Sequence, residues 1–592
     1  MTTSILKRTH NCNQLGISDL NKETTLMGWV QTRRDHGGVI FVDLRDREGV
    51  TQVVFNPEYS AGVHKQAHVI RNEFVIGIKG IVSKRPEGMI NKKLATGEIE
   101  IMADRLEIYN SASTPPFLIE EDTDASENIR LRYRYLDLRR PDMQKNIRTR
   151  HKTGVVIRNF LNENGYLDIE TPFLTKSTPE GARDYLVPSR VNSGQFYALP
   201  QSPQLFKQVL MVAGFDKYYQ IVKCFRDEDL RADRQPEFTQ IDIEASFVDK
   251  EEIMKLSEKM MKKIFDEILN IKLKIPFNRL SYDEAMLRYG LDKPDTRFGL
   301  ELIDISEIME KSGCKVFADA VKKGGIVKAI NAKKCASFSR KEIEQFTEFV
   351  GVYNAKGLAW IKIKENGKWQ SPIAKFFTEQ EIDALSDKID MQKDDIIFFV
   401  ADKPKVVNEA LGNLRNHLAE KLDLIDKNLY NFLWVTDFPM FQYDEAEKAY
   451  QALHHPFTSP KKADLDKLET NPLSVKSEAY DLVLNGSEIG GGSIRNHRTD
   501  IQKKIFGILG IEEEGYKEKF GFLLEALEAG APPHGGIAFG LDRLVMILCG
   551  TTSIREVIAF PKTQKAACLF TNAPSAASKM QLEELFIKVK RV

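Results

Sequence analysis

The sequence predicts an α+β multidomain protein, in which an N-terminal β-barrel precedes a larger α+β core and a further α+β domain is inserted into that core. Three observations lead to this fold class. The chain has 592 residues, enough for several domains. Segments typical of strands and of helices are mixed along it. Polar residues of the kind found in ligand sites form two blocks, 180–242 and 454–543, separated by a stretch that lacks them.

The composition is typical of a globular protein, with 42% hydrophobic and 29% charged residues. No run of 18 apolar residues occurs, so no membrane span is expected. The N-terminal segment lacks the apolar stretch of a secretory signal. The six cysteines form no CxxC pair, which argues against structural zinc and a disulfide framework; they are Cys12, Cys224, Cys314, Cys335, Cys549 and Cys568. We therefore expect a cytoplasmic protein.

Charge is balanced over the chain but not along it. The 85 basic and 85 acidic residues cancel, so the net charge gives no indication of nucleic-acid binding. Residues 130–152 contain nine Lys or Arg and only two Asp or Glu. Such a run could lie along a phosphate backbone, but a solvated linker and helix face fits it equally well.

Residues 1–110 are predicted to form a five-stranded barrel of the OB type. Three strands are expected within 24–55, joined by short turns, followed by a helix near 58–72 and two further strands. Barrels of this type often bind single-stranded nucleic acid through aromatic and polar groups on one face. Phe41 and Gln52 lie on neighbouring strands and suit that use, although an ordinary barrel surface is the alternative.

A segment rich in Ser, Thr, Pro and acidic residues follows the barrel, and we assign 111–140 to a linker or hinge. The core is predicted to begin at 141 and to occupy 141–294. It includes an amphipathic helix that ends at Asn164-Gly165.

Residues 295–425 change in character. They contain strand-like and helical segments without a dense acid–base cluster, and we predict an inserted α+β domain. The core then resumes over 426–560, and 561–592 is a C-terminal extension with a helix expected over 570–592.

The segment 225–244 is the most informative part of the chain. A charged loop joins two strand-like runs, and the arginines at 226, 231 and 234 suit an anionic ligand such as a nucleoside triphosphate. The second run alternates strictly: Phe238, Gln240, Asp242 and Glu244 lie on one face, and Thr239, Ile241, Ile243 and Ala245 on the other. The first face is predicted to be the floor of a polar ligand site. An exposed, salt-bridged hairpin is the alternative.

Two further groups are candidates for ligand contacts. Pro203 favours a helix start, and Gln204 and Lys207 then lie on one helix face, where Lys207 can present its charge to a carboxylate. His454 and His455 resemble a metal-binding pair. Adjacent histidines diverge, however, and no third ligand follows at a useful spacing, so we reject zinc.

The second block contains a pair of carboxylates before a glycine run. Asp481 and Glu488 could hold Mg²⁺, and glycines 490–492 would let the backbone approach a ligand closely. A regular strand would place Glu488 and Arg495 on opposite faces. A bulge in the glycine run would align them.

The last motif is a short apolar strand, a turn at Gly540 and an apolar helix. Arg543 falls in the first helical turn, near the positive helix end, where anions bind well. An ordinary helix start with an N-terminal Asp542 is the alternative.

Three ordered segments resemble the signature motifs of class II aminoacyl-tRNA synthetases. They are the helix–strand–Pro junction at 165–172, the FRDEDLRADRQPEFTQID segment from 225 to 242, and the GLDR segment at 540–543. The second is similar to the bacterial aspartyl-tRNA synthetase family of class IIb in particular. The resemblance spans nearly the whole chain and implies an antiparallel-sheet catalytic core flanked by helices, a homodimer, and ATP-dependent ligation of L-aspartate to tRNA(Asp) through aspartyl-adenylate.

The resemblance also implies residue roles. The catalytic residues would be Arg226, Glu488 and Arg543. Aspartate would be bound by Glu180, Gln204, Lys207, Arg226, Asp242, His454 and Arg495. ATP would be bound by Arg226, Asp227, Glu228, Gln235, Phe238, Glu488, Gly540, Leu541, Asp542 and Arg543, with Arg543 lying over the adenine opposite Phe238. Mg²⁺ would be held by Asp481 and Glu488, and zinc is not expected.

On the barrel, the resemblance implies that Phe41, Gln52 and Glu100 meet the anticodon. Members of the family that charge both tRNA(Asp) and tRNA(Asn) tend to carry His and Gly where this chain has His36 and Gly88. Neutral variation of loop tips is the alternative. Two other functions also stay open: a related asparaginyl- or lysyl-type ligase, and an RNA-binding paralogue without charging activity.

Overall fold

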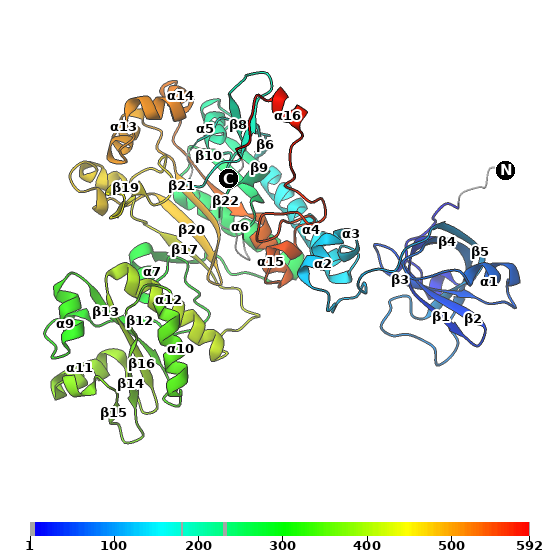
Figure 1. Cartoon of the computed structure of the whole chain (residues 1–592), viewed down its shortest axis with the longest axis horizontal. Helices are drawn as coiled ribbons and strands as arrows, with labels where there is room; N and C mark the ends of the chain where they lie inside the picture. Colours follow the sequence, from blue (N-terminus) through cyan, green and yellow to red (C-terminus); the bar gives the residue numbers. More distant parts are fainter. Residues whose placement is uncertain (1–5, 179–180, 229–233, 591–592) are drawn as a thin grey trace. The chain divides into compact units, whose positions relative to one another are not determined.

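A computed structural model describes residues 6–178, 181–228 and 234–590. The chain divides into two compact units. The first comprises residues 1–148 with 555–575, and the second comprises residues 149–554 with 576–592. Figure 1 shows the elements of each unit.

The first unit contains a closed five-stranded barrel with strand order β1-β2-β3-β5-β4, as predicted. Its elements are β1 (Glu23–His36), β2 (Val39–Arg45), β3 (Val50–Phe55), α1 (Ala61–Ala67), β4 (Val75–Lys84) and β5 (Ile99–Asn110). Strand β2 shows how the sequence produces the barrel. Ile40 and Val42 are fully buried in its core, whereas Phe41 and Asp43 alternate with them and point outward, partly exposed.

The basic run at 130–152 is used largely for internal ion pairs. Helices α2 (Glu127–Arg132) and α3 (Arg134–Asp137) follow the barrel in the first unit. Arg134 and Arg140 are buried and both bind the fully buried Asp137. Arg139 binds Glu73 of the barrel at 2.8 Å. These internal ion pairs account for Arg134, Arg139 and Arg140, so contact with a phosphate backbone is not needed to explain them.

The second unit is built on an eight-stranded sheet with order β11-β17-β20-β21-β22-β10-β9-β6. Only the two outermost pairs, β11 with β17 and β6 with β9, are parallel. The strands are β6 (Leu167–Asp168), β9 (Lys217–Phe225), β10 (Glu237–Ser246), β11 (Asn278–Ser281), β17 (Phe432–Thr436), β20 (Ala479–Leu484), β21 (Ser487–Ile494) and β22 (His534–Gly540). Two hairpins accompany it, β7 (Leu186–Pro188) with β8 (Phe196–Ala198) and β18 (Phe441–Asp444) with β19 (Ala449–Ala452).

Helices accompany this sheet (Figure 1). Helices α5 (Gln204–Val212), α6 (Lys250–Leu269), α7 (Tyr282–Tyr289) and α15 (Leu541–Cys549) contact its strands. Helix α14 (Glu513–Glu528) packs against α5 and against α13 (Thr499–Ile508), and α4 (Pro141–Glu163) reaches β10 through Arg150. Helix α6 begins with a capping box of Asp249 and Glu252. Helix α15 starts directly after β22 and ends at Gly550, whose positive φ closes the helix.

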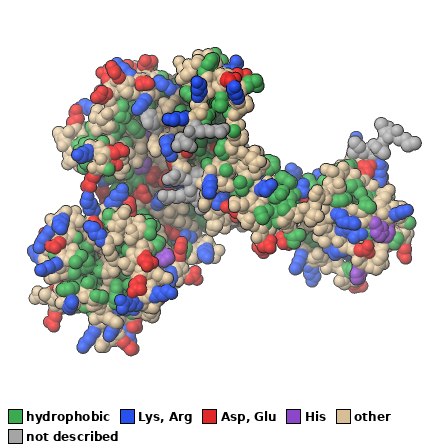
Figure 2. All heavy atoms as spheres, viewed as in Figure 1, with side chains coloured by type: hydrophobic (Ala, Val, Ile, Leu, Met, Phe, Trp, Pro, Cys, Tyr) green, Lys and Arg blue, Asp and Glu red, His purple; other side chains and the backbone are tan. Residues whose placement is uncertain are grey.

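The inserted segment forms a sheet of its own, with strand order β12-β13-β16-β14-β15 and only antiparallel pairs. The strands are β12 (Leu302–Asp304), β13 (Ile326–Ala332), β14 (Ala359–Ile363), β15 (Trp369–Gln370) and β16 (Ile396–Asp402), and the helices are α8 (Ser306–Met309), α9 (Lys315–Lys322), α10 (Arg340–Gly351), α11 (Glu379–Ile389) and α12 (Pro404–Lys421). Separate apolar clusters cover the two faces. Acidic and basic side chains are interspersed on the face shown in Figure 2.

Two features differ from the sequence expectation. Helix α4 begins at Pro141, because proline is favoured in the first turn, and is longer than the amphipathic segment indicated. Within the described part of the tail, 570–590, the one helix is the six-residue α16 (Lys579–Glu584), in place of the expected helix over 570–592. Its apolar side chains find little to pack against, since Phe586 is 71% exposed, and a short helix without packing is marginal. Among the helices of the described residues, none is long and apolar enough to cross a membrane.

Candidate active site

The antiparallel register of the large sheet brings the two predicted blocks together. Asp242 on β10 lies opposite Ala538 on β22, Ala538 lies opposite Gly491 on β21, and Gly491 lies opposite Asp481 on β20. Residues that lie directly opposite one another project from the same face of a sheet. Asp242 and Asp481 therefore share one face, with two small residues between them as a shallow floor.

Strand β10 has the two faces that its alternation predicts. Ile241, Ile243 and Ala245 are fully buried on one face. The other face carries Asp242 and Glu244, with Phe238 and Gln240 toward the open end of the strand. Phe238 and Gln240 line a cavity, as the polar-floor interpretation expects, whereas Asp242 and Glu244 are buried in ion pairs.

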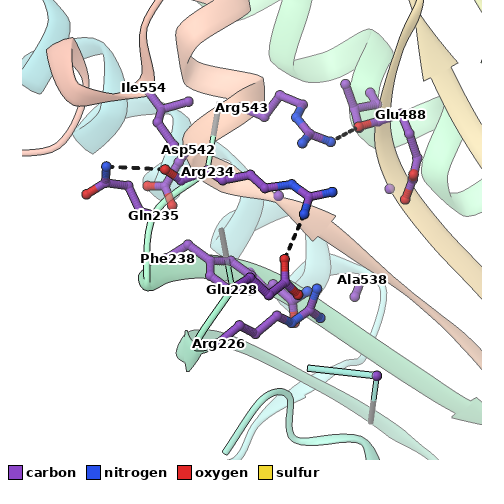
Figure 3. Close-up of a pocket in the computed structure, with 15 residues that line it drawn as sticks. Arg226, Glu228, Arg234, Gln235, Phe238, Glu488, Ala538, Asp542, Arg543 and Ile554 are labelled. Atoms are coloured by element: carbon purple, nitrogen blue, oxygen red, sulfur yellow. Dashed lines mark hydrogen bonds and ion pairs between the residues drawn. The ribbon is translucent and has the colours of Figure 1, made fainter. Parts of the chain in front are cut away.

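A cavity of about 440 Å³ opens on this face. Side chains of both blocks line it: Gly181, Arg226, Glu228, Arg234, Gln235, Phe238, Gln240, Glu488, Ile489, Gly490, Ala538, Gly540, Asp542, Arg543 and Ile554. Figure 3 shows the charged groups converging on it. Residues 226–240 of the first block and 488–543 of the second thus meet at one cavity.

The arginines have distinct partners. The Arg226 guanidinium lies 5.0 Å from the centre of the Phe238 ring, and its Nε is buried without a hydrogen-bond partner among the described residues. Arg543 donates to the backbone carbonyl of Glu488. Arg234, which the sequence assignment left out, reaches across the pocket to Glu228 at 2.8 Å (Figure 3). A planar ligand between Phe238 and Arg543 would meet the Arg234 side chain first.

Asp542 lines the cavity and also connects two parts of the fold through its carboxylate. One of its carboxylate oxygens accepts from the backbone N–H of Thr239 at 2.7 Å, and the other is bound by Arg150 of helix α4. Arg150 also donates to the Thr239 hydroxyl at 3.0 Å. This carboxylate therefore ties the start of α15 to strand β10 and so fixes Arg543 relative to Phe238.

Strand β21 contains the bulge that the sequence required. Leu482 pairs with Gly490 and Val483 with Glu488, which leaves Ile489 without an opposing residue. One extra residue reverses the alternation of the side chains along the strand, so Glu488 and Arg495 can project from the same face of the sheet. The bulge lies immediately before the glycine run.

Asp481 and Glu488 face each other across Gly491. A Cβ atom at Gly491 would lie 2.7 Å from Asp481 Oδ1 and 3.4 Å from Glu488 Oε1. The negative charge of Asp481, together with burial, raises the pKa of Glu488. Two close carboxylates of this kind fit a divalent cation, and Mg²⁺ typically uses one or two carboxylates with phosphate and water oxygens. The part of the chain that the structure describes contains no group of three or more His, Cys, Asp or Glu residues that could hold a metal ion, so the remaining ligands would come from elsewhere.

Substituting alanine for Gly491 should raise the Mg²⁺ concentration required for activity by about 10-fold or more, because the new methyl group would press into this carboxylate pair. The measurement is the Mg²⁺ dependence of ATP–pyrophosphate exchange, the activity that the sequence resemblance implies. Gly507→Ala is the matched control, since a Cβ atom there meets nothing within 4 Å. An unchanged Mg²⁺ dependence in Gly491→Ala would contradict this assignment of the pair.

A buried ionic cluster lies further along the same face of β10. Lys207 Nζ is 2.6 Å from Asp242 Oδ1 and 3.1 Å from Glu244 Oε2. Arg495 donates to both oxygens of Glu244, from Nε at 3.0 Å and from Nη2 at 3.1 Å, and to Ser493 Oγ at 2.7 Å. Gly536 makes room for Glu244, because a Cβ atom there would lie 2.2 Å from its Oε2.

The cluster sets the ionisation of its carboxylates. Burial alone would raise the pKa of Glu244, but Arg495 and Lys207 lower it to about 2. Burial raises the pKa of Asp242, and Lys207 partly offsets that effect. Both cations are thus held in place by carboxylates before any substrate enters.

The structure places the other predicted residues as follows. Gln204 is buried on α5 and donates to Gln208 at 3.0 Å. His454 Nε2 is 3.5 Å from Asp481, so this ring lies beside the carboxylate pair and not among the Lys207–Arg495 cluster. Asp227 and Leu541 do not line the cavity. Glu180 lies outside the described residues.

Sequence reasoning missed Glu244 and Arg150 as site components. The alternation of β10 had already placed Glu244 beside Asp242, so a signal existed for it. Arg150 had no such signal, because its partners Thr239 and Asp542 are distant in the sequence. Arg234 was noted for its charge but was not assigned.

The barrel carries the residues predicted for RNA contact on neighbouring strands. The side-chain amide of Gln52 donates to Glu100 at 2.8 Å, and its oxygen Oε1 accepts from Arg34 at 3.4 Å. Burial raises the pKa of Glu100. Phe41 is partly exposed on the adjacent strand. Gln52 and Glu100 are largely buried, and Phe41 adds a partly exposed aromatic ring.

His36, the last residue of β1, and Gly88, in a turn of the barrel, are both exposed. Gly88 has φ +84°, and a Cβ atom there would meet nothing within 4 Å. Backbone conformation and not space is therefore what favours glycine at this position.

The chain was compared with known proteins. Residues 126–564 match the family model described as tRNA synthetases class II (D, K and N), and residues 24–109 match that of the OB-fold nucleic acid binding domain. A protein of Desulfosudis oleivorans named aspartate–tRNA(Asp/Asn) ligase is 63% identical over 99% of this chain and 98% of its own length. A protein of the same name from Caldanaerobacter subterraneus is 55% identical over 99% of this chain and 98% of its own length.

Among solved structures, asparaginyl-tRNA synthetase from Pyrococcus horikoshii, complexed with asparaginyl-adenylate, matches with a TM-score of 0.59. The match covers 94% of this chain and 99% of that chain at 19% identity, and it supports the fold only. The barrel and the antiparallel core predicted from the sequence are those of this family. The chain belongs to the class II tRNA synthetases of the D, K and N group and carries an OB-fold nucleic acid binding domain at its N-terminal end.

Proposed function

We propose that this protein ligates L-aspartate to tRNA(Asp), with ATP as co-substrate and aspartyl-adenylate as intermediate, and that it also charges tRNA(Asn). The observation that carries the aspartate assignment is the buried Lys207–Arg495 cluster, which lies on the same face of β10 as the cavity residues Phe238 and Gln240. Two buried cations beside a polar cavity suit a small acidic substrate. The full-length relatives named aspartate–tRNA(Asp/Asn) ligase support the same reaction.

The wide part of the cavity would hold ATP. Arg226 would meet the α-phosphate, Glu228 and Gln235 would contact the nucleotide, and Phe238 with Arg543 would enclose the adenine. This placement requires Arg234 to leave its position between Phe238 and Arg543 when ATP binds. Gly540 and Asp542 would shape the same end of the cavity.

The chemistry needs no protein nucleophile. The aspartate α-carboxylate attacks the α-phosphorus in line and pyrophosphate leaves; the terminal 3′-hydroxyl of the tRNA then attacks the adenylate carbonyl and AMP leaves. The residues contribute by placing the reactants and by stabilising negative charge that develops on phosphate oxygens. Asp481 and Glu488 would hold Mg²⁺, which would neutralise triphosphate charge. The catalytic roles fall on Arg226, Glu488 and Arg543.

The buried end of the site would select aspartate over asparagine. The two amino acids have nearly the same shape, so discrimination must come from hydrogen bonding. Lys207 and Arg495 offer only donors to the substrate side chain, and an amide NH₂ facing them would be left unpaired. Gln204, Asp242, Glu180, Arg226 and His454 would contact the rest of the amino acid.

The barrel would bind the anticodon through Phe41, Gln52 and Glu100, which combine an aromatic ring with base-edge partners. Charging of tRNA(Asn) is supported by His36 and Gly88 and by the names of the relatives. We also propose that the protein is a cytoplasmic homodimer. Strand β6 is an edge of the large sheet and exposes Leu167, and such edges favour association.

The proposal is tested by charging assays with purified tRNA(Asp) and tRNA(Asn) and radiolabelled aspartate. We expect both tRNAs to become aspartylated, with rates within about 100-fold of each other, because one mismatched contact typically changes binding by about 1–3 kcal/mol. Labelled asparagine and lysine serve as controls for the related ligases and should not be incorporated. Charging of tRNA(Asp) alone would remove the tRNA(Asn) assignment, and charging of neither would favour a paralogue without this activity.

A further inference from the structure

His455 differs from its neighbour His454 in its surroundings. Its Nε2 atom is buried and has no hydrogen-bond partner among the described residues. A buried donor without a partner is costly, and in a ligand site it indicates an acceptor supplied by the ligand. The ring itself is fixed, since it stacks on Phe457 with the ring centres 5.4 Å apart.

The tautomer of His455 follows from its other nitrogen. Nδ1 accepts a hydrogen bond from the backbone N–H of Phe457 at 3.3 Å, so it carries no proton. Burial and the nearby charges of Arg495 and Lys207 lower the pKa of His455 to about 3, and the ring is therefore neutral near pH 7. Its single proton must then reside on Nε2, which can donate but not accept.

The turn that carries His455 is joined to the segment that carries Arg495. The N–H of Asn496 donates to the carbonyl of Phe457 at 2.8 Å, and the N–H of Ser459 donates to that of Ile494 at 2.9 Å. Thr458 and Arg495 form a backbone bridge between these two bonds. The imidazole is thus held at the cationic end of the site.

Arg495 is only partly satisfied by its known partners. Glu244 occupies Nε and one hydrogen of Nη2, and Ser493 occupies one hydrogen of Nη1. One hydrogen remains on each terminal nitrogen without a partner in the described parts of the chain, and that of Nη2 points toward the end of the guanidinium fork, since Glu244 takes the side of Nε. Lys207 likewise binds two carboxylates and has a third hydrogen.

We infer that His455 is a specificity-determining residue, whose Nε2–H donates a hydrogen bond to the side-chain carboxylate of the substrate aspartate beside Arg495 and Lys207. This inference rests on the proposed function. Because Nδ1 is already engaged, the ring cannot change tautomer to accept from an amide. His455 would therefore favour a carboxylate over the NH₂ group of asparagine without adding a charge to the cluster.

The test compares the aspartate and ATP dependence of ATP–pyrophosphate exchange in His455→Phe and the wild type. We expect His455→Phe to raise KM for aspartate about 10- to 100-fold, the effect of losing a hydrogen bond to a charged group. The value of kcat and KM for ATP should stay within about 3-fold of wild type, since the lost contact is made equally in the ground and transition states. His417→Phe is the matched control, because His417 stacks on Phe349 in the inserted domain and is remote from the substrate cluster.

Two amide variants separate hydrogen bonding from packing. His455→Gln can present an N–H near the position of Nε2 and should restore KM for aspartate to within about 5-fold of wild type, whereas His455→Asn reaches only the position of Nδ1 and should resemble the phenylalanine variant. They also replace His455→Phe if that protein does not fold.

Wild-type KM for aspartate in His455→Phe or His455→Asn would overturn the inference. So would equal losses in the glutamine and asparagine variants accompanied by a raised KM for ATP, which would indicate a structural role. Failure of the proposed function itself is distinguishable, because the wild type would then show no aspartate-dependent exchange.

Discussion

Replacing Arg495 by leucine is expected to abolish aspartate-dependent ATP–pyrophosphate exchange, lowering kcat/KM for aspartate by at least about 1,000-fold. The guanidinium is buried, and its terminal fork is the part of the cluster best suited to a carboxylate. A leucine would present a hydrocarbon surface to the substrate carboxylate, which would lose its water without gaining a partner. The measurement is aspartate-dependent exchange at saturating ATP.

The same substitution should also destabilise the folded protein. This loss of stability must be distinguished from the loss of substrate binding. Glu244 is fully buried and would lose its bidentate partner, at a cost of about 3–5 kcal/mol. The double variant Arg495→Leu/Glu244→Leu removes both charges and should recover much of the lost thermal stability. We expect the double variant to remain inactive toward aspartate.

Near-normal exchange in a folded Arg495→Leu protein would exclude Arg495 from the aspartate site. If instead the double variant regained both stability and activity, the role of Arg495 would be to neutralise Glu244. Melting temperature and exchange rate, measured on the same preparations, distinguish these outcomes.

Much of the site could be predicted because its signals are local. The strict alternation of β10 placed Asp242 and Glu244 on one face from the sequence, and the structure has them there. In a regular strand Glu488 and Arg495 would lie on opposite faces, so placing both at the site required a bulge. The structure shows one at Ile489. Both inferences depend only on the period of a β-strand.

What could not be predicted depends on partners that are distant along the chain. The basic run at 130–152 could equally have bound phosphates, and only the fold reveals that Arg134 and Arg140 bind Asp137 and that Arg150 binds Asp542. The position of His454 beside Asp481 is of the same kind. The sequence shows which charged side chains are present, but tertiary packing determines which of them form ion pairs.

The other large effect is expected from Arg226→Ala, which should lower kcat for ATP–pyrophosphate exchange by about 100- to 1,000-fold, as expected for loss of a single group that stabilises charge in the transition state. Arg226 differs from Arg495 in its bonding. Its guanidinium lies over the Phe238 ring, its Nε has no partner in the described residues, and no ion pair to another described residue holds it. It is available to a phosphate group.

This difference predicts a different effect on stability. No carboxylate among the described residues depends on Arg226 for charge compensation, so Arg226→Ala should change the melting temperature far less than Arg495→Leu does. Arg234→Ala is the matched control, since Arg234 lines the same cavity but is half exposed and paired with Glu228. We expect that control to lower kcat less than about 10-fold, because an exposed ion pair contributes little. A loss in Arg234→Ala equal to that in Arg226→Ala would mean that the α-phosphate is held by the loop as a whole, whereas wild-type kcat in Arg226→Ala would place the phosphate elsewhere in the cavity.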